Sequence, residues 1–284
     1  MKLVIIGYGY SSAAIAREIG PSLSALHVTA RSAGKVGRLA AEALEASVFD
    51  GSSIPDTLAT ALDVATTILV SAPPGDAGDP LLKAPGFAAL EMKRLHRILY
   101  LSTVGVYGDH GGGWVEETSE LRPVSQRSRQ RVAAEQAWRE FAEKRGLDLG
   151  IFRLSGIYGP GRSAIDNLRA GTARRIVKPG QVFNRIHVGD IAGAVAKAFW
   201  HDAPLGVFNL TDDEPCPPQD VVAHAAGLLG LEPPPEIPFE VADLSPMGRS
   251  FYGENKRVSN AKIKRELGYA FRYPTYREGL AACL

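Results

Sequence analysis

Cysteines and long apolar runs are scarce in this chain. Its 284 residues include only two cysteines, Cys216 and Cys283, which lie far apart in the sequence. We therefore expect free thiols in a reducing cytoplasm rather than a disulfide framework or a metal site. The polar "GYGYSS" interrupts the apolar start, and no run reaches the roughly 18 apolar residues that a membrane span needs. The sequence predicts a soluble cytoplasmic protein with no membrane partner.

Charge of one sign is also missing. Lys and Arg total 32 and Asp and Glu total 31, which gives a net charge of +1. A balanced chain of this kind argues against general polyanion binding, so we expect no nucleic-acid partner. The six histidines show no metal-ligand spacing. Neither a Gly-x-Ser-x-Gly elbow nor a cysteine-nucleophile motif is present, so hydrolase chemistry has no support.

Short apolar runs alternate with helical stretches up to about residue 200, and this alternation predicts the fold class. The runs are "KLVIIG", "ALHVTA", "ASVFD", "TTILVSA" and "RILYLST". The last two are almost wholly apolar, as strands buried on both faces are. We expect an α/β fold with a doubly wound, Rossmann-like parallel sheet.

The pattern changes after residue 210, where proline-rich joints separate short helices such as "VVAHAAGLLG". We expect a small, mostly helical C-terminal lobe. The predicted domains are a dinucleotide-binding domain at 1–157 plus 187–210 and a smaller substrate lobe at 158–186 plus 211–284. The connection 158–186 is assigned to the lobe because it leaves the core and re-enters it.

The first apolar run leads directly into "GYGYSS" and then into a helix, the context of a pyrophosphate cradle. Gly7 permits the tight turn, and Gly9 lets a phosphate approach the backbone at the positive end of the helix. Ser12 replaces the third glycine of the dinucleotide fingerprint, and either Ser11 or Ser12 caps the helix or touches phosphate. The predicted contacts of this loop are Gly7, Gly9, Tyr10, Ser11 and Ser12; the alternative is a purely structural turn.

The end of the second predicted strand indicates which dinucleotide is bound. An NAD site usually carries a carboxylate there, which binds the ribose 2′-hydroxyl. This chain has "TARSAGK" instead, with Arg31, Ser32 and Lys35. A guanidinium matches a 2′-phosphate, so the sequence predicts NADP(H) in preference to NAD(H). The alternative is a set of solvated charges at a strand end.

Two further strand ends are expected to line the cofactor. "VFDG" offers Asp50 and Gly51, with Asp50 equally plausible as a simple loop cap. "VSAPPG" would place Ser71, Ala72 and Pro73 along the dinucleotide. None of these residues is specific by itself.

Three segments carry a family resemblance: "LYLSTVGVYGD", "FRLSGIYGPGR" and "RIHVGDIAGAV". Together with "GYGYSS", they make the chain resemble the extended short-chain dehydrogenase/reductase family, the epimerase/dehydratase-like group. The resemblance implies an NAD(P) cofactor, a small-molecule substrate and a homodimer. That family contains sugar-nucleotide epimerases, dehydratases and reductases.

The resemblance also assigns site residues. Thr103 matches the hydroxyl residue that bonds the substrate oxygen, and strand alternation means that only one of Ser102 and Thr103 faces the site. Within "SQRSRQRVAAEQAW", Arg127 and Arg131 fall at the positions of the family's Tyr-x-x-x-Lys pair. With a pKa above about 12, an arginine cannot act as a general acid or base at neutral pH.

Other phenols are candidates for the missing proton donor. Tyr107 in "VYG" and Tyr158 in "GIYGPG" match positions near the site, and side-chain packing is the alternative for both. A second Tyr-x-x-x-Lys, Tyr252 to Lys256, lies in the C-terminal lobe, where we interpret it as part of an ordered loop.

Two functions remain open. The first is an NADP(H)-dependent oxidoreductase or epimerase of an atypical branch, acting on a small carbonyl or sugar-type substrate for which Arg127 and Arg131 favour anionic character. Its predicted catalytic residues are Thr103, Arg127, Arg131 and Tyr158. The second is a non-catalytic NADP(H)-binding redox sensor, because fold alone does not establish turnover.

Overall fold

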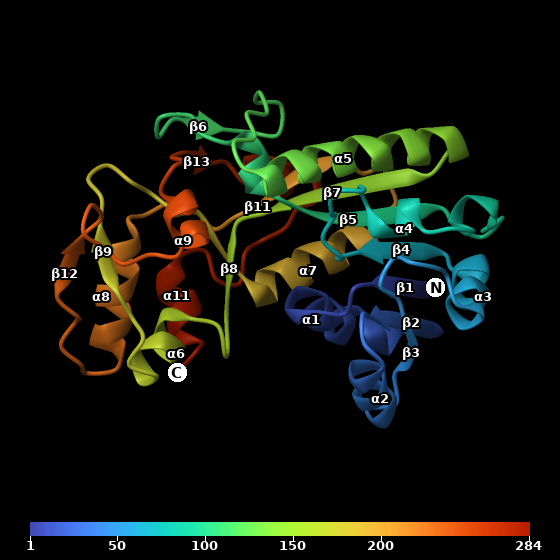
Figure 1. The fold of residues 1–284 in the computed structure, drawn as a ribbon, viewed down its shortest axis with the longest axis horizontal. Coiled ribbons are helices and arrows are strands. Elements are labelled where there is room, and N and C mark those ends of the chain that lie inside the picture. Colours follow the sequence, from blue (N-terminus) through green and yellow to red (C-terminus); the bar gives the residue numbers. More distant parts are fainter. The chain divides into compact units, whose positions relative to one another are not determined.

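The computed structural model describes residues 1–284 (Figure 1). By its internal contacts, the chain consists of two compact units. The first unit comprises residues 1–103, 126–153 and 192–208, and the second comprises residues 104–125, 154–191 and 209–284. The stretch 104–125, which we expected in the dinucleotide-binding domain, thus groups with the second unit. The reason is a strand pairing: β6 (Trp114–Val115) lies parallel to β13 (Arg257–Val258).

The seven-stranded parallel sheet confirms the predicted α/β fold class. Its strand order is β11-β7-β5-β4-β1-β2-β3, so the chain builds outward from β1 and then crosses back to β4. The strands are β1 (Lys2–Ile6), β2 (Ala25–Ala30), β3 (Glu45–Val48), β4 (Thr67–Val70), β5 (Arg97–Thr103), β7 (Asp148–Leu154) and β11 (Val207–Leu210). The reversal of order between β1 and β4 is where folds of this class bind dinucleotides.

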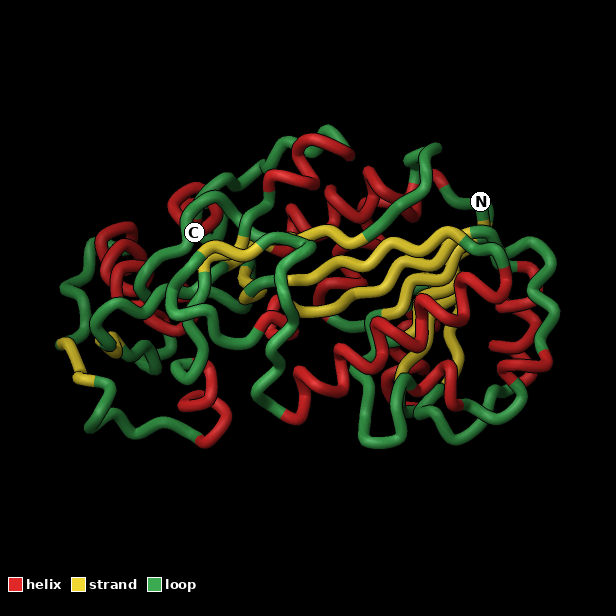
Figure 2. The backbone as a smooth tube through the Cα atoms, turned by 90° about the horizontal axis from the view of Figure 1, so that it is seen from above, coloured by secondary structure: helices red, strands yellow, loops and turns green.

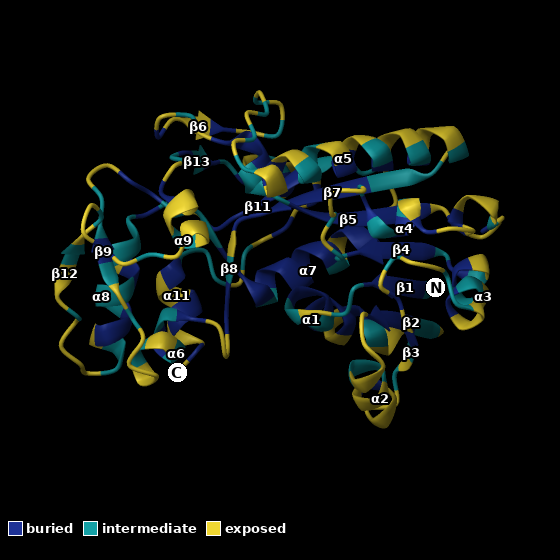
Figure 3. Cartoon of the chain, in the orientation of Figure 1, coloured by how far each residue is buried: buried dark blue, intermediate teal, exposed yellow.

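Both faces of the sheet are buried, because alternate residues of each strand pack on opposite sides. Val4 and Ile6 belong to an apolar cluster with Trp138, whereas their neighbours Leu3 and Ile5 are buried outside that cluster. Helices cover both faces (Figure 2), and the central strands are uniformly buried (Figure 3). The helices with residues in the first unit are α1 (Tyr10–Ile19), α2 (Ala33–Ala41), α3 (Asp56–Val64), α4 (Pro80–Lys83), η2 (Phe87–Ala89), α5 (Gln126–Arg145) and α7 (Val188–Phe199), together with η1 (Gly20–Ser22).

Helix α5 is held on the sheet by a narrow stripe of buried side chains. Ala134, Trp138 and Ala142 recur every four residues and are buried, while most of the remaining helix is polar. The Trp138 ring lies 6.3 Å from that of Tyr100 on β5, measured between centroids. Its indole N–H also donates to the Asp79 carboxylate at 3.0 Å. This stripe fixes which face of α5 looks at β5.

The second unit is assembled from short pieces. Besides β6 and β13, the parallel pairs are β8 (Gly156–Tyr158) with β10 (Arg185–His187) and β9 (Arg175–Val177) with β12 (Glu236–Pro238). Its helices are η3 (Val104–Tyr107), α6 (Ala164–Arg169), α8 (Pro218–Leu228), α9 (Pro246–Phe251), α10 (Ala261–Glu266) and α11 (Tyr276–Ala281). The three strand pairs add β-structure to a lobe that the sequence predicts as mostly helical.

One buried carboxylate anchors the C-terminal segment within this unit. Asp190, at the start of α7, is fully buried. It accepts hydrogen bonds from the Tyr269 hydroxyl at 2.8 Å and from the backbone N–H of Arg272 and Tyr273 at 2.7 and 3.0 Å. None of the helices in the structure combines the length and apolar character that a membrane crossing requires.

Candidate cofactor and active site

The loop between β1 and α1 is tight at one glycine and open at the next. Gly7 has φ of +89°, and a Cβ there would lie 2.8 Å from the backbone nitrogen of Ala72. A Cβ on Gly9 would meet nothing within 4 Å, and Gly9 is exposed. The first turn of α1 contains no acidic residue. The loop therefore fits a pyrophosphate, because a phosphate can approach the Gly9 backbone at the positive end of the helix.

Ser12 closes this loop from within. It is fully buried, its hydroxyl accepts from the Gly9 N–H at 2.7 Å, and the same hydroxyl donates to the Gly7 carbonyl at 2.9 Å. Of the two roles that we considered for Ser12, these bonds favour capping over contact with phosphate. Ser11 is also buried, and Tyr10 is half-buried at the start of α1.

Of the three polar residues after β2, Ser32 is bonded to Lys35, and Lys35 reaches the glycine loop. Ser32 caps α2, because its hydroxyl accepts from the Lys35 N–H. The Lys35 ammonium group donates to the Tyr8 carbonyl, between the two loop glycines. Arg31 is exposed beside them. The structure thus brings a basic group to the end of β2, where an acidic residue would bind a free ribose.

The remaining predicted cofactor residues occupy the ends of β3 and β4. The Asp50 carboxylate accepts from the Ser52 N–H and hydroxyl at 2.9 and 2.6 Å, and these bonds, with that from the hydroxyl foremost, lower the pKa of Asp50. This geometry favours the loop-cap interpretation of Asp50. The neighbouring Gly51 has φ of +96°. The backbone N–H groups of Ser71 and Ala72 both donate to the Ile6 carbonyl at 2.9 Å, which holds these residues and exposed Pro73 beside the glycine loop.

Ser102 and Thr103 occupy the last two positions of β5 and differ in exposure. Ser102 is buried, and its hydroxyl donates to the Glu135 carboxylate of α5 at 2.6 Å. Thr103 is half-buried at the end of the strand. Ser102 points toward α5. Because neighbouring strand residues point to opposite sides of a sheet, Thr103 points to the other side.

The two arginines of α5 stand in different surroundings. Arg131 is half-buried, and its Nη1 donates to the Tyr100 hydroxyl at 3.0 Å and to the Leu101 carbonyl at 2.8 Å. Its guanidinium carbon lies 5.7 Å from the centre of the Tyr100 ring. Arg127, one turn earlier, is exposed. Arg131 is therefore fixed against β5, whereas Arg127 lies at the surface of the same helix.

The sequence did not predict a buried hydrogen-bond network formed by Ser102, Glu135 and Arg153. Glu135 and Arg153 are both almost completely buried, and Arg153 donates to the Glu135 carboxylate through Nε at 3.1 Å and Nη2 at 2.8 Å. With Ser102, they join β5, α5 and β7. Glu135 lies four residues after Arg131 and one turn before Trp138, so its place on the buried stripe was a usable signal.

The phenols considered as proton donors are held inside the second unit. The Tyr107 hydroxyl is buried and donates to Asn209 Oδ1 at 2.7 Å. The Tyr158 hydroxyl donates to the Thr275 carbonyl at 3.5 Å, and a Cβ built on Gly279 would lie only 1.9 Å from it. Burial is the main cause that raises the pKa of Tyr158. These contacts favour the packing alternative for both tyrosines.

The two residues of the second Tyr-x-x-x-Lys, Tyr252 and Lys256, contact different parts of the second unit. Tyr252 lies in an aromatic cluster, 5.0 Å from the Phe183 ring and 4.9 Å from the Phe239 ring between centroids. The Lys256 ammonium group donates to the Gly108 carbonyl at 2.8 Å and to Glu254 at 2.7 Å. Each side chain stabilises a different part of the unit, in agreement with an ordered loop.

Comparison with known proteins shows what this chain is similar to. A family model described as NAD dependent epimerase/dehydratase family matches residues 86–210. The solved structure of a conserved protein of unknown function from Silicibacter pomeroyi DSS is 44% identical, with a TM-score of 0.87, and the match covers 99% of this chain and 97% of that one. Protein YeeZ of Escherichia coli (strain K12) is 31% identical over 185 residues, which are 64% of this chain and 60% of YeeZ.

A further relative has a described activity. The 3-diazoavenalumate denitrifying reductase of a Streptomyces species is 29% identical over 143 residues, 46% of this chain and 45% of the reductase. The chain thus spans about half to three-fifths of the length of these curated relatives. The family match covers β5 and α5, the elements that carry Thr103 and the two arginines. Over residues 86–210 the chain is thus similar to the NAD dependent epimerase/dehydratase family, and the geometry of its glycine loop fits a dinucleotide pyrophosphate.

Proposed function

We propose that this protein is an NADP(H)-dependent oxidoreductase that acts on a small, anionic carbonyl-type substrate. The observation that carries the proposal is the basic group at the end of β2, where the Lys35 ammonium group reaches the Tyr8 carbonyl beside exposed Arg31. A 2′-phosphate is favoured by these cations, and no carboxylate stands at the strand end to repel it. The similarity to a reductase favours hydride transfer over epimerisation.

The residues of the first unit suit the binding and polarisation of a substrate better than proton transfer. A bound nicotinamide dinucleotide supplies or accepts the hydride. Thr103, half-buried at the end of β5, would donate a hydrogen bond to the substrate oxygen. Arg127 would contact an anionic group, and Arg131, fixed by Tyr100 and Leu101, would contribute a positive charge that does not need to reorganise.

In this proposal, Arg127 and Arg131 take the places of the family's tyrosine and lysine. An arginine stabilises negative charge but holds its proton at neutral pH, so the substrate must be one that needs little general-acid help. An activated or anionic carbonyl meets that requirement. Any proton that is required then comes from water.

The cofactor preference can be tested by titrating the protein with NADPH and with NADH and following intrinsic fluorescence. Arg31→Asp is expected to weaken NADPH binding at least about tenfold more than NADH binding, since it replaces a cation by an anion at the 2′-phosphate. Arg38→Asp, an equal charge change at an exposed position of the following helix α2, serves as the control. Equal losses for both dinucleotides on Arg31→Asp would refute the NADP(H) assignment.

A non-catalytic NADP(H)-binding redox sensor is the second candidate function. The specific observation in its favour is that both candidate phenols, Tyr107 and Tyr158, are buried and hydrogen-bonded to other protein groups. Absorbance of NADPH, followed with a panel of aldehydes, ketones and sugar nucleotides, separates the two functions. Turnover that disappears in Thr103→Ala but survives in Thr118→Ala supports the oxidoreductase. Tight binding without turnover on any substrate favours the sensor.

A further inference from the structure

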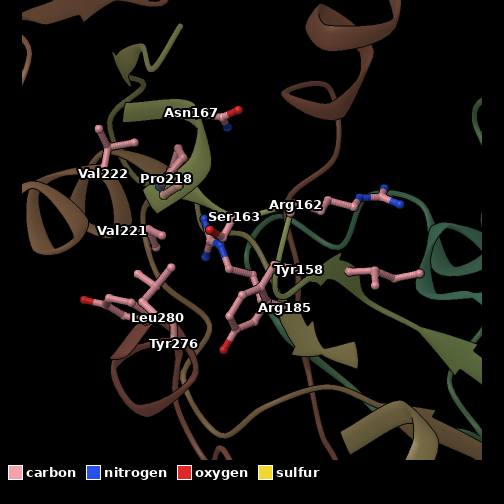
Figure 4. Close-up of a pocket in the computed structure, with 13 residues that line it drawn as sticks. Tyr158, Arg162, Ser163, Asn167, Arg185, Pro218, Val221, Val222, Tyr276 and Leu280 are labelled. Atoms are coloured by element: carbon pink, nitrogen blue, oxygen red, sulfur yellow. The ribbon is translucent and has the colours of Figure 1, made fainter. Parts of the chain in front are cut away.

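The second unit contains a cavity of about 450 Å³ that lies entirely within that unit (Figure 4). It is formed where β8 and β10 meet the helices α6, α8 and α11. The volume is in the range of sites that hold small organic molecules. None of the residues that line it is one of the candidate cofactor contacts, although Tyr158 forms part of its wall.

One side of the cavity is apolar, and the other carries a cation. Val221 and Val222 of α8 and Leu280 of α11 form the apolar side. Arg185 of β10 enters beside Tyr158 and Ser163, and Figure 4 shows its guanidinium turned inward, whereas Arg162 points away. Such a combination suits a ligand with an apolar body and a charged end.

Only one nitrogen of the Arg185 guanidinium, Nη1, is hydrogen-bonded within the protein. Its Nη1 donates to the carbonyl groups of Phe183 at 3.1 Å and Cys216 at 3.4 Å, and it lies 3.1 Å from the Cys216 sulfur. These contacts orient the group, but the structure gives Nε and Nη2 no protein partner. No carboxylate lies within 4.0 Å of Arg185, although the side chain is partly buried. A partly buried cation without a counterion is costly, and an anionic ligand offsets that cost.

The nearby acidic residues do not supply the missing counterion. Asp212 is 1% exposed, and burial raises its pKa to about 8, so it remains protonated at neutral pH despite the opposing influence of Arg185. Asp213 binds Lys264, and Glu214 binds Arg277. The charge of Arg185 is therefore left uncompensated inside the cavity.

We propose that this cavity binds a small aryl or branched-chain carboxylate, with the carboxylate on Arg185 and the apolar body against Val221, Val222 and Leu280. The planar fork of a guanidinium pairs with a planar carboxylate through two parallel hydrogen bonds. A phosphate would gain from one arginine but would leave the apolar wall unused. The site is independent of the proposed oxidoreductase activity, since it shares no residue with the glycine loop, Thr103 or α5.

Isothermal titration of the full chain tests this site, with 3-phenylpropionate as the probe and 3-phenylpropionamide as its neutral counterpart. The acid is expected to bind at least about tenfold more tightly than the amide, because only the acid forms a charge-assisted pair with Arg185. The affinity for NADPH, measured in the same samples, keeps a failure of this site distinct from a failure of the cofactor proposal.

Three variants locate the binding. Arg185→Gln should remove the preference for the acid over the amide, and Val222→Trp should abolish binding of both by filling the cavity without touching Arg185. Arg169→Gln, which removes an exposed cation of α6 that does not line the cavity, should leave both affinities unchanged. Circular dichroism verifies that each variant is folded; if Arg185→Gln does not fold, Val222→Trp decides. Equal affinities for acid and amide, no saturable binding, or binding that survives Val222→Trp would overturn the proposal.

Discussion

The two compact units differ in how completely their buried polar side chains are hydrogen-bonded. In the first unit, buried charges have partners: Glu135 binds Arg153, and Arg97 binds Asp148 at 2.7 Å. Only Thr67 among its buried side chains leaves a polar atom without a hydrogen bond. In the second unit, buried atoms without a partner occur in six residues: Ser155, Arg175, His187, Asp212, Gln219 and His224.

The unpaired atoms distinguish the second unit from the first, in which almost every buried polar side chain is hydrogen-bonded. An unpaired buried polar atom costs free energy, and such costs are tolerated mainly where water or a ligand completes the bonding. The first unit presents its chemistry at strand ends and on exposed loops. The second unit has unpaired polar atoms in its interior, and two of these residues lie close to the Arg185 cavity: Asp212 interacts electrostatically with Arg185, and the His187 ring lies 5.3 Å from that of Tyr158.

The largest effect that this comparison predicts is the loss of a paired charge in the first unit. Glu135→Gln leaves Arg153 buried without its counterion, so the free energy of unfolding should fall by about 3–5 kcal/mol. Urea denaturation followed by circular dichroism measures it. Glu143→Gln, an exposed carboxylate on the same helix, should change the value by less than about 0.5 kcal/mol. A loss below about 1 kcal/mol for Glu135→Gln would mean that the buried pair contributes little.

The second prediction concerns the unpaired carboxyl of Asp212. Its folded-state pKa of about 8 lies above the ordinary value of 3.8, so the folded protein keeps a proton that the unfolded chain loses. The proton on Asp212 therefore stabilises the folded state fully below about pH 4. As the pH rises to about 8 this stabilisation is lost, and the free energy of unfolding falls by up to about 1.4 kcal/mol per pH unit.

Asp212→Asn removes this titration. Urea denaturation of both proteins between pH 5 and pH 8 should show a difference in stability that grows with pH in favour of the variant, with the comparison confined to that range by choice of buffers. The groups that act on Asp212 from nearby are Arg185, Asp213 and Glu214. Parallel pH profiles for the two proteins would show that Asp212 is ionised throughout and that Arg185 has a counterion.

The third prediction uses the two loop glycines as a matched pair. Gly7→Ala forces a Cβ to within 2.8 Å of the Ala72 nitrogen at a positive φ, so unfolding free energy should fall by about 1–3 kcal/mol. Gly9→Ala meets no protein atom, so stability should change by less than about 0.5 kcal/mol while NADPH affinity drops at least about tenfold. Unchanged affinity in Gly9→Ala would show that the loop is only a structural turn.

The sequence predicted best where structure depends on local periodicity. "ALHVTA" and "RILYLST" are β2 and β5 with the expected bounds, because buried parallel strands are continuous apolar runs. The glycine loop was predictable for the same reason, since its conformation depends on residues that are adjacent in the sequence. The sequence has Ser12 where the dinucleotide fingerprint has its third glycine. Only the structure shows what this serine does: its hydroxyl donates to the Gly7 carbonyl.

The features that the sequence did not predict depend on contacts between residues that lie far apart in the chain. The β8–β10 and β9–β12 pairs join very short strands whose partners lie far along the chain, and no periodicity can develop over three residues. The pairing of Glu135 with Arg153 and the orientation of Tyr107 toward Asn209 are of the same kind. Residue type suggested a catalytic phenol; burial and a remote partner determined what the phenol does.

The smallest predicted effect bears on that phenol. Tyr158→Phe removes a hydroxyl whose protein hydrogen bond, to the Thr275 carbonyl, is long at 3.5 Å. We expect the free energy of unfolding to change by less than about 1 kcal/mol, since the bond is weak and the ring remains in its apolar cluster. If the protein turns over a substrate, its maximal rate and pH profile should be unchanged, because burial raises the pKa of this phenol and thus disfavours proton release. A large fall in kcat with stability preserved would instead assign Tyr158 a proton-transfer role, and the second unit would then contribute chemistry as well as binding.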